Sequence, residues 1–410
     1  MVNDHSIPDK WNVSRIIDIV ENIIDYRGRT PLKLGMEWGK GDIPALSARN
    51  VKMGRIDYEE ETYYGSEDLY KRWMSNNCTK KDDIVITTEA PLGNVALIPD
   101  DSKYILSQRT ILLHTIPTIV LNRYLYHYFV SKRFQNILAK HSTGSTAKGI
   151  QRKKFETLEI IYPPLPEQTA IADALSDADD LITSLDRLIA KKRDIKQAAM
   201  QELLTGKKRL PGFGTGKGYQ NTDLGEIPED WKIKVLGNIV EFLDGQRRPV
   251  KDKDRAKMNG EYPYYGASGI VDYVNDYLFD ENLILLGEDG ENILSRNSRL
   301  AFKVTGKVWV NNHAHVFKPH DDINIDFLTE YLETLDYTPY NTGTAQPKLN
   351  KKTCFDISVL VPNYEEQTTI ANVLSDMDAN IADLEEKRDK ARMIKEGMMQ
   401  ELLTGRIRLV

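Results

Sequence analysis

Two long stretches of the chain carry apolar residues at alternating steps of three and four. In residues 167–210 these positions begin at Ile171, and in residues 366–409 they begin at Ile370. This spacing is typical of a long helix with one apolar seam that packs against a partner helix. We therefore predict two helices that pack on each other within one chain. The predicted seam consists of Ile171, Leu175, Ile182, Leu185, Ile370, Leu374, Ile381 and Leu384.

The two stretches are copies of one another. When the sequence is shifted by 199 positions, 24 of 44 residues are identical, and MQELLTG occurs unchanged at residues 200–206 and 399–405. The closing glycine suits the left-handed position that follows a helix, and Glu167 and Glu366 suit the positive N-terminus of a helix. About 39 helical residues would extend for roughly 58 Å.

The regions before the two helices also repeat in outline. Runs that suit strands are DIVITT and VALIP in the first half, and NLILLG, LAFKV and KVWV in the second. In each half a helical pattern, a polar loop and a closing strand follow. We predict an α+β fold in which two globules are bridged by an intramolecular antiparallel coiled coil of two long helices, with pseudo-two-fold symmetry. The predicted parts are a first globule (1–163), a first helix (164–210), a linker (211–227), a second globule (228–362) and a second helix (363–410).

Composition changes this picture little. Forty per cent of the residues are hydrophobic, which is enough for two cores. No run reaches the ~18 apolar residues of a membrane span, because ILLHTIPTIVL is interrupted by His114 and Pro117. The two cysteines, Cys78 and Cys354, form no metal or disulfide pattern, so we expect a cytoplasmic protein. A net charge of −6 argues weakly against nucleic acid, although residues 1–163 carry more basic than acidic side chains.

No catalytic motif is complete. The glycine-rich segment 212–218 lacks the Ser or Thr that follows the lysine of a phosphate-binding loop. His313 and His315 have the spacing of metal ligands, but no cysteine or acidic cluster completes a site. The DSK sequence at 101–103 lacks the partner acid of a nuclease, and YPPL at 162–165 lacks the amide or acid of an amino-methyltransferase motif. We therefore expect no catalytic residue, metal or cofactor in this chain.

Two basic loops at equivalent places are more informative. Residues 140–154 and 338–354 contain several basic side chains and no acidic one. Small residues let backbone amides approach phosphates and lysines add charge, although a solvated surface loop is the alternative. Arginines in two matching turns could read guanine, contact phosphate or form structural ion pairs. The predicted DNA-binding residues are Arg27, Arg29, Thr143, Gly144, Lys148, Arg152, Lys153, Lys154, Arg247, Arg248, Thr342, Gly343, Lys348, Lys351 and Lys352.

With these features in view, the chain resembles the specificity subunit of type I restriction–modification systems over essentially its whole length. The resemblance rests on the duplicated EQ…MQELLTG helices, the IPxxW openings at 7–11 and 227–231, TTEAPLGNVALIP and VNNHAHVFKP. It implies two target recognition domains that each read one half of a bipartite double-stranded DNA target. It also implies that the helices set the spacer between the halves and dock two methyltransferase subunits.

The resemblance assigns the chemistry to partner subunits. The methyltransferase subunits would bind S-adenosylmethionine, and restriction subunits would use ATP and Mg²⁺. A fused methylase or nuclease is an alternative that would show a cofactor loop or a metal triad. A coiled-coil scaffold that does not bind DNA is a second alternative. IPALSARNVKMGRIDY and YPYYGASGIVDYVNDY align only loosely, so the residues that contact bases are not assigned by the resemblance.

Overall fold

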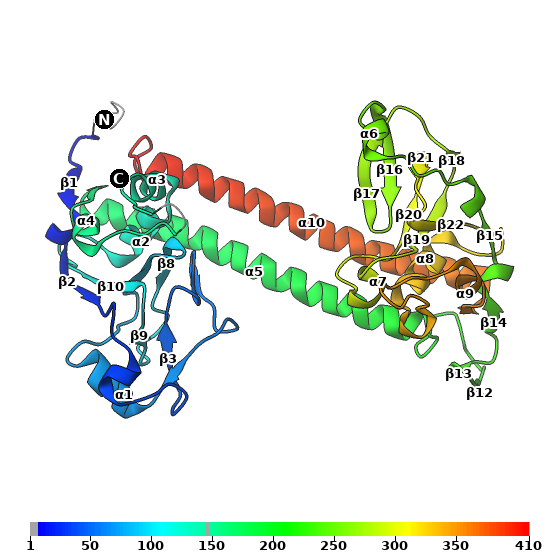
Figure 1. The fold of residues 1–410 in the computed structure, drawn as a ribbon, viewed down its shortest axis with the longest axis horizontal. Coiled ribbons are helices and arrows are strands. Elements are labelled where there is room, and N and C mark those ends of the chain that lie inside the picture. The colour runs from blue at the N-terminus through cyan, green and yellow to red at the C-terminus, as the bar shows by residue number, and fades with distance from the viewer. Residues whose placement is uncertain (1–6, 145–146, 410) are drawn as a thin grey trace. The chain divides into compact units, whose positions relative to one another are not determined.

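The computed structural model describes residues 7–144 and 147–409. The chain divides into two compact units: unit 1 contains residues 1–185 and 386–410, and unit 2 contains residues 186–385. Helix α5 (Leu165–Leu203) and helix α10 (Tyr364–Leu402) each have 39 residues, and each contributes to both units (Figure 1). Among the described residues, no helix has the length and apolar character needed to cross a membrane.

Unit 1 is built on a four-stranded antiparallel sheet in the order β2-β10-β7-β8. Its strands are β2 (Val20–Asp25), β10 (Thr110–Thr115), β7 (Ile84–Thr88) and β8 (Leu92–Leu97). Side chains alternate between the two faces of a strand. Ile84 and Ile86 therefore enter the core that contains the start of α5, while Val85 enters a second core beneath a smaller sheet. Burial on both faces explains why DIVITT contains three consecutive apolar residues, at 84–86.

The smaller sheet of unit 1 has the order β6-β3-β9, and β3 and β9 are parallel. A further pair, β1 with β11, joins the N-terminal segment to the strand before α5. The remaining elements of unit 1 are β1 (Asn12–Arg15), β3 (Ile43–Leu46), β4 (Val51–Lys52), β5 (Arg55–Ile56), β6 (Tyr64–Gly65), α1 (Glu67–Met74), β9 (Ile105–Leu106), α2 (Asn122–Val130), α3 (Lys132–Lys140), α4 (Arg152–Glu156) and β11 (Glu159–Tyr162), with 3-10 turns at Ile16–Asp18 and Pro31–Leu34.

Unit 2 repeats this plan. Its four-stranded antiparallel sheet has the order β15-β22-β19-β20, and a second sheet, β17-β16-β21-β18, contains the parallel pair β16/β21. The elements of unit 2 outside the long helices are β12 (Tyr219–Thr222), β13 (Gly225–Pro228), β14 (Lys232–Val235), β15 (Val240–Phe242), α6 (Asp252–Arg255), β16 (Asn259–Gly266), β17 (Gly269–Val274), β18 (Phe279–Asp280), β19 (Leu283–Gly287), α7 (Asn292–Ser295), β20 (Ala301–Val304), β21 (Lys307–Val310), β22 (Ala314–Pro319), α8 (Ile325–Thr334), α9 (Lys351–Phe355) and β23 (Ser358–Val361), with 3-10 turns at Leu236–Asn238, Asp244–Gln246 and Thr338–Tyr340.

A buried carboxylate joins the repeated motifs within unit 1. Glu167, fully buried in the first turn of α5, accepts a hydrogen bond from the indole of Trp11 at 3.2 Å. Arg408, just beyond α10, donates two hydrogen bonds to the same carboxylate, at 2.5 and 2.7 Å. The start of α5, the end of α10 and the IPDKW segment therefore meet at one charge-assisted site.

Unit 2 contains the same arrangement. Glu366 accepts from the indole of Trp231 at 3.2 Å and from Arg209 at 2.5 and 2.7 Å. Hydrogen bonds from Arg209 also lower the pKa of Asp230 to about 2. The recurrence of EQ, IPxxW and the closing Arg-Leu thus has a physical cause, because each unit uses one copy of each motif.

The glycine of MQELLTG has its own reason. Gly206 and Gly405 have φ values of +74° and +71°, a backbone conformation that residues with a side chain rarely adopt. A Cβ atom at Gly206 would lie 2.6 Å from Pro228, and one at Gly405 would lie 2.4 Å from Pro8. The glycine therefore lets the end of each helix approach the proline of an IPxxW segment.

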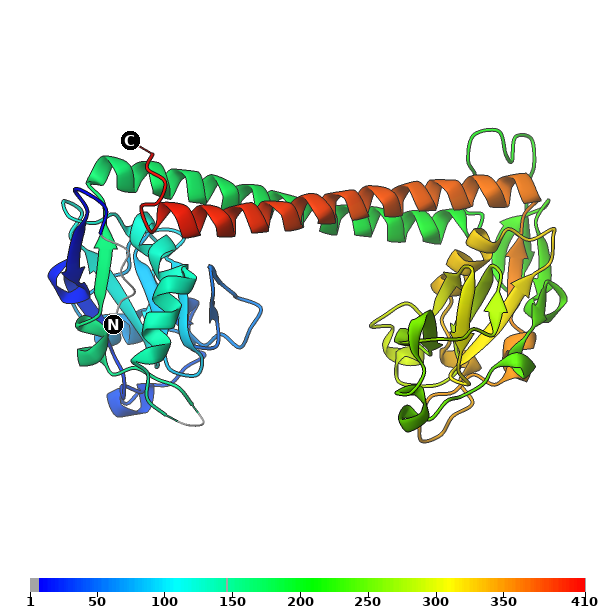
Figure 2. The same cartoon turned by 90° about the horizontal axis from the view of Figure 1, so that it is seen from above.

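The two long helices contact one another inside each unit (Figure 2). In unit 1, Lys395 of α10 pairs with Asp179 of α5 at 2.5 Å. In unit 2, Lys196 of α5 pairs with Asp378 of α10 at 2.7 Å, and Arg193 pairs with Glu385. Residue numbers rise along one helix as they fall along the other, so the helices are antiparallel within unit 2.

The predicted seam has two kinds of member. Ile171 and Leu175 pack in the core of unit 1, and Ile370 and Leu374 pack in the core of unit 2, so these four residues also anchor the globular parts. Further along the helices, Ile381 is buried, and Ile182, Leu185 and Leu384 are half-buried.

The predicted linker differs from the structure. Part of segment 211–227 forms a β-hairpin, in which Tyr219 pairs with Pro228 and Thr222 pairs with Gly225. The sequence shows no apolar alternation there, although Ile227 of β13 lies in the core of unit 2.

Candidate nucleic-acid interface

The first predicted loop is closed by its own backbone. Thr143 and Gly149 exchange two hydrogen bonds of 2.9 Å, and the amide of Ile150 donates to the carbonyl of Thr88 at the end of β7. Gly144 has a φ of +105°, and a Cβ atom there would lie 2.2 Å from the carbonyl oxygen of Ala147. Glycine is therefore required for the loop to fold back, and the side chain of Lys148 is exposed at its end.

The second predicted loop closes in the same way. The amide of Thr342 donates to the carbonyl of Lys348 at 2.8 Å, and the carboxamide oxygen of Asn341 accepts from the amides of Gly343 and Lys348 at 3.0 and 2.9 Å. The amide of Leu349 donates to the carbonyl of Glu288, the residue after β19. Both loops are thus attached at the same end of equivalent strands.

Short helices follow both loops and carry the other predicted lysines. In α4, Arg152 pairs with Glu156 at 2.7 Å, while Lys153 and Lys154 are exposed. In α9, the ammonium group of Lys351 lies 5.4 Å from the ring of Phe242, and Lys352 is exposed. The exposed lysines present their charge to solvent next to the closed loops, as a phosphate-binding surface requires.

The arginines of unit 1 are held by neighbouring groups. Arg27 forms an ion pair with Asp25 at 2.6 Å and donates to the carbonyl of Ile150 at 3.4 Å. Arg29 donates to the carbonyl of Trp73 and stacks over the ring of Tyr26 at 4.4 Å. Arg27 therefore forms a structural ion pair, which was one of the three roles considered for these arginines. Its contact with Ile150 places it beside the first loop.

The two arginines of unit 2 differ from each other. Arg247 is half-buried and donates to Glu288 and to the carbonyl of Ala314, both at 2.7 Å. Arg248 is exposed, and among the described residues no hydrogen bond or ion pair to its guanidinium is found. Arg247 therefore has a structural ion pair, whereas Arg248 is available for a ligand.

A network of charges lies beneath the second loop. His315, which is 1% exposed, hydrogen-bonds through Nδ1 to Asp244 at 2.7 Å and through Nε2 to the carbonyl of Leu349 at 2.9 Å. Burial works against its charge, but the hydrogen bond to Asp244 and the nearby Cys354 outweigh burial and raise the pKa of His315 to about 10. Glu288 pairs with Arg247 and, at 3.2 Å, with Lys348. The network thus connects the turn at Arg247 to the loop at Lys348.

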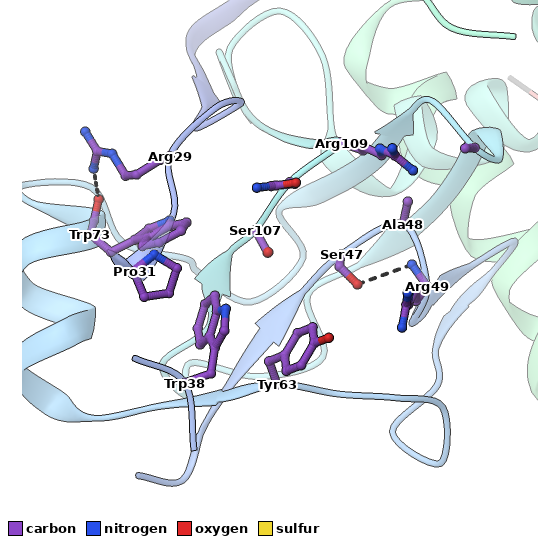
Figure 3. A pocket seen from close by; sticks show the side chains of 12 residues that line it. Arg29, Pro31, Trp38, Ser47, Ala48, Arg49, Tyr63, Trp73, Ser107 and Arg109 are labelled. Atoms are coloured by element: carbon purple, nitrogen blue, oxygen red, sulfur yellow. Dashed lines mark hydrogen bonds between the residues drawn. The ribbon is translucent and has the colours of Figure 1, made fainter. Parts of the chain in front are cut away.

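Unit 1 also contains a cavity of about 480 Å³ beside its parallel strand pair (Figure 3). One side is aromatic, where Trp38 stacks with Tyr63 at a centroid distance of 5.8 Å. Figure 3 shows Arg109 on the side away from these rings, whereas Arg49 and the hydroxyl of Tyr63 both contact Glu61. Arg29, a predicted site residue, also lines this cavity, together with Gln108.

Unit 2 has a cavity of about 430 Å³. It is lined by Ser268, Asn312 and His313 and by the apolar residues Pro249 and Val271. Apart from Arg29, the predicted DNA-binding residues did not include the polar residues of either cavity. In the sequence, most of these residues are marked only by their position directly after strand-like runs, in LSARN, LSQR and VNNH. That position can be interpreted only once the register of the strands is known.

Comparisons with known proteins agree with this architecture. Residues 8–192 and 228–391 match the model of the type I restriction modification DNA specificity domain. The MjaVIII specificity subunit of a type I restriction enzyme from Methanocaldococcus jannaschii is 24% identical over 440 residues, which covers 98% of this chain and 94% of that protein. A putative type I specificity subunit from Haemophilus influenzae is 34% identical over 150 residues, or 37% of each chain.

The fold is also similar to that of a solved structure. The S subunit of a type I restriction-modification system from M. genitalium superimposes with a TM-score of 0.59 at 17% identity, covering 98% of both chains. Because two copies of the family model together match most of the sequence, the chain belongs to the family of type I restriction–modification DNA specificity subunits.

Proposed function

We propose that this chain recognises a bipartite DNA sequence on behalf of a type I restriction–modification complex and catalyses no reaction itself. Unit 1 would bind one half-site and unit 2 the other. The observation that carries the proposal is that each unit has an equivalent glycine-containing loop, closed by backbone hydrogen bonds and followed by a short lysine-bearing helix. Two equivalent surfaces of this kind suit two related sites on one duplex.

The long helices would form an antiparallel coiled coil that relates the two units by a pseudo-two-fold axis and sets the spacer. The ion pairs between α5 and α10 within each unit support this part of the proposal. The helices would also dock two methyltransferase subunits. In unit 2, α5 exposes Leu188 and Ile195, and in unit 1, α10 exposes Met393 and Ile394, which are apolar side chains that a partner could cover.

The partner subunits would supply the chemistry. Methyltransferase subunits would bind S-adenosylmethionine and modify adenine, which requires the base to leave the stack. Restriction subunits would use ATP and Mg²⁺. The role of this chain would be to hold the duplex in a fixed register on both half-sites.

The test is to map methylated adenines in DNA from cells that contain this chain with its methyltransferase subunits. We expect one bipartite sequence with a fixed spacer. Deletion of residues 219–410 should abolish modification of the complete target. Methylation of a single continuous sequence, or an unchanged methylation pattern when this chain is omitted, would refute the proposal.

A further inference from the structure

The two cavities occupy equivalent positions, which the strand registers establish. In unit 1 the parallel pair β3/β9 aligns Leu46 with Leu106, and in unit 2 the pair β16/β21 aligns Tyr265 with Val310. The chain continues alike beyond both pairs: the amide of Ser107 donates to the carbonyl of Leu46 at 2.8 Å, and that of Asn311 to the carbonyl of Tyr265 at 3.1 Å. Counting on from these pairs makes Gln108 equivalent to Asn312 and Arg109 to His313, while Arg49 and Ser268 each lie three residues beyond the paired residue of β3 or β16.

Burial follows the same pattern at these positions. Ser107 and its equivalent Asn311 are both buried. The next two residues of each segment are exposed, as are Arg49 and Ser268 in the turns that follow β3 and β16. Each unit therefore presents three polar side chains, two of them from equivalent positions, and these side chains differ in chemistry between the units.

Each cavity also adjoins a predicted DNA-binding loop. Glu89 pairs by its backbone with Gly149 of the first loop, and its carboxylate lies 3.9 Å from Arg109 of the cavity. In unit 2, Asp289 pairs by its backbone with Lys348 of the second loop and hydrogen-bonds to His313 at 2.9 Å. One acidic residue thus connects loop and cavity in both units, so a duplex held by the loop would bring its bases near the cavity.

We infer that the three exposed polar side chains of each cavity read the bases of one half-site: Arg49, Gln108 and Arg109 in unit 1, and Ser268, Asn312 and His313 in unit 2. This inference rests on the proposed DNA recognition and assigns its specificity. Arginine recognises guanine through O6 and N7, and the amides of glutamine and asparagine recognise adenine through N6 and N7. The half-site of unit 1 therefore includes guanine and an adenine read by Gln108, and that of unit 2 includes an adenine read by Asn312.

Bases fit these positions better than phosphates do. Gln108 and Asn312 are neutral, so they add no attraction for the DNA backbone. Arg49 is paired with Glu61, and Arg109 and His313 lie beside Glu89 and Asp289. These carboxylates would repel a phosphate, but they fix the direction of the donors that face a base edge.

The experiment selects preferred sequences from randomised duplex DNA, using the full chain assembled with its methyltransferase subunits. Gln108→Ala should relax one position of one half-site and leave the other half unchanged, and Asn312→Ala should do the reverse. The preference at the relaxed position should fall by about tenfold, while the salt dependence of binding stays the same. Gln108→Arg and Asn312→Arg should each change the preferred base at that position from adenine to guanine.

The matched control is Asn282→Ala, which truncates an exposed asparagine at the opposite end of β19 from the second cavity. It should retain the wild-type sequence preference. Because Gln108 and Asn312 are exposed, their variants keep the core, and thermal unfolding checks this. If a wild-type bipartite preference survives in all four cavity variants, the assignment of the cavities is wrong. If the wild-type complex itself selects no sequence, the proposed function fails instead.

Discussion

At the level of single residues, the clearest difference between the two units is the buried charge beneath the second loop. His315 of unit 2 is equivalent in position to Ile111 of unit 1. The first residue pair is Thr110 with Thr87 between β10 and β7, and Ala314 with Gly287 between β22 and β19; Ile111 and His315 are the next residues along β10 and β22. The protonated imidazole has two acceptors, Asp244 and the carbonyl of Leu349, so its charge is compensated inside the protein. Arg247, Glu288 and Lys348 complete the network.

This difference predicts a pH dependence of unit 2. The pKa of His315 is raised to about 10, above its ordinary value of 6.5, because burial is outweighed by its hydrogen bond to Asp244 and by Cys354. A raised pKa stabilises the folded form fully below pH 6.5, and this stabilisation is lost as pH rises towards 10. Hydrogen exchange should therefore show the protection of unit 2 falling between pH 6.5 and 10 relative to unit 1, after correction for the intrinsic exchange rate.

His315→Gln should remove most of that pH dependence, whatever its effect on stability at neutral pH. Equal loss of protection in both units between pH 6.5 and 10, in the wild-type protein, would contradict this role for His315.

At the level of elements, the conformation of the helix ends depends on glycine, and the proposed DNA binding by the loops depends on lysine. Gly206 and Gly216 share a φ of +74°, but a Cβ atom would meet Pro228 at Gly206 and no atom within 4 Å at Gly216. Gly206→Ala and Gly216→Ala therefore share a backbone penalty of roughly 1–2 kcal/mol, and only Gly206→Ala adds a steric clash. We expect Gly206→Ala to lower the free energy of unfolding of unit 2 clearly more than Gly216→Ala in chemical denaturation. Equal losses of unfolding free energy in the two variants would show that the end of the helix does not pack tightly against the proline.

The loop lysines predict a salt effect. Reversing the charge of Lys148, Arg152, Lys153 and Lys154 should weaken binding to all DNA sequences. The slope of log affinity against log salt should fall by about one unit for each phosphate that the loop no longer neutralises. The ion pair of Arg152 with Glu156 makes its contribution smaller than that of the exposed lysines. Reversal of the exposed Lys71, Lys80 and Lys81 is the control, and an identical slope in both variants would remove the loop from the interface.

At the level of the whole molecule, the proposed ruler can be tested by its length. Four residues inserted after Leu185 in α5 and four after Glu385 in α10 fall at the division between the units, so the ion pairs inside each unit keep their register. Four helical residues add about 6 Å and slightly more than one turn. We expect methylated sites with the same half-site sequences and a spacer longer by about one or two base pairs. An active complex with an unchanged spacer would refute the ruler, and an insertion in α5 alone should impair assembly.

Several features of the protein could be predicted from the sequence because their physical causes are local or periodic. Heptad spacing and duplicated ends predict α5 and α10, and strand-like runs predict β7, β8, β19, β20 and β21, because helix and strand periodicities can be recognised along the chain. MQELLTG also predicts its left-handed glycine, since the end of a helix is a local structure. The family resemblance is confirmed by the family model, which matches residues 8–192 and 228–391.

Other features were decided only by the tertiary structure. The contact of Arg27 with Ile150, the half-buried position of Arg247 against Glu288 and the exposure of Arg248 depend on residues far away in sequence, so the matching turns gave no basis for separating these arginines. The cavities are lined by segments about 60 residues apart in unit 1 and 44 in unit 2, from Arg49 to Arg109 and from Ser268 to Asn312. Only the parallel strand pairs bring these segments together and set their register. Periodicity along a chain fixes which face of an element is buried, whereas the pairing of distant strands fixes which polar side chains meet.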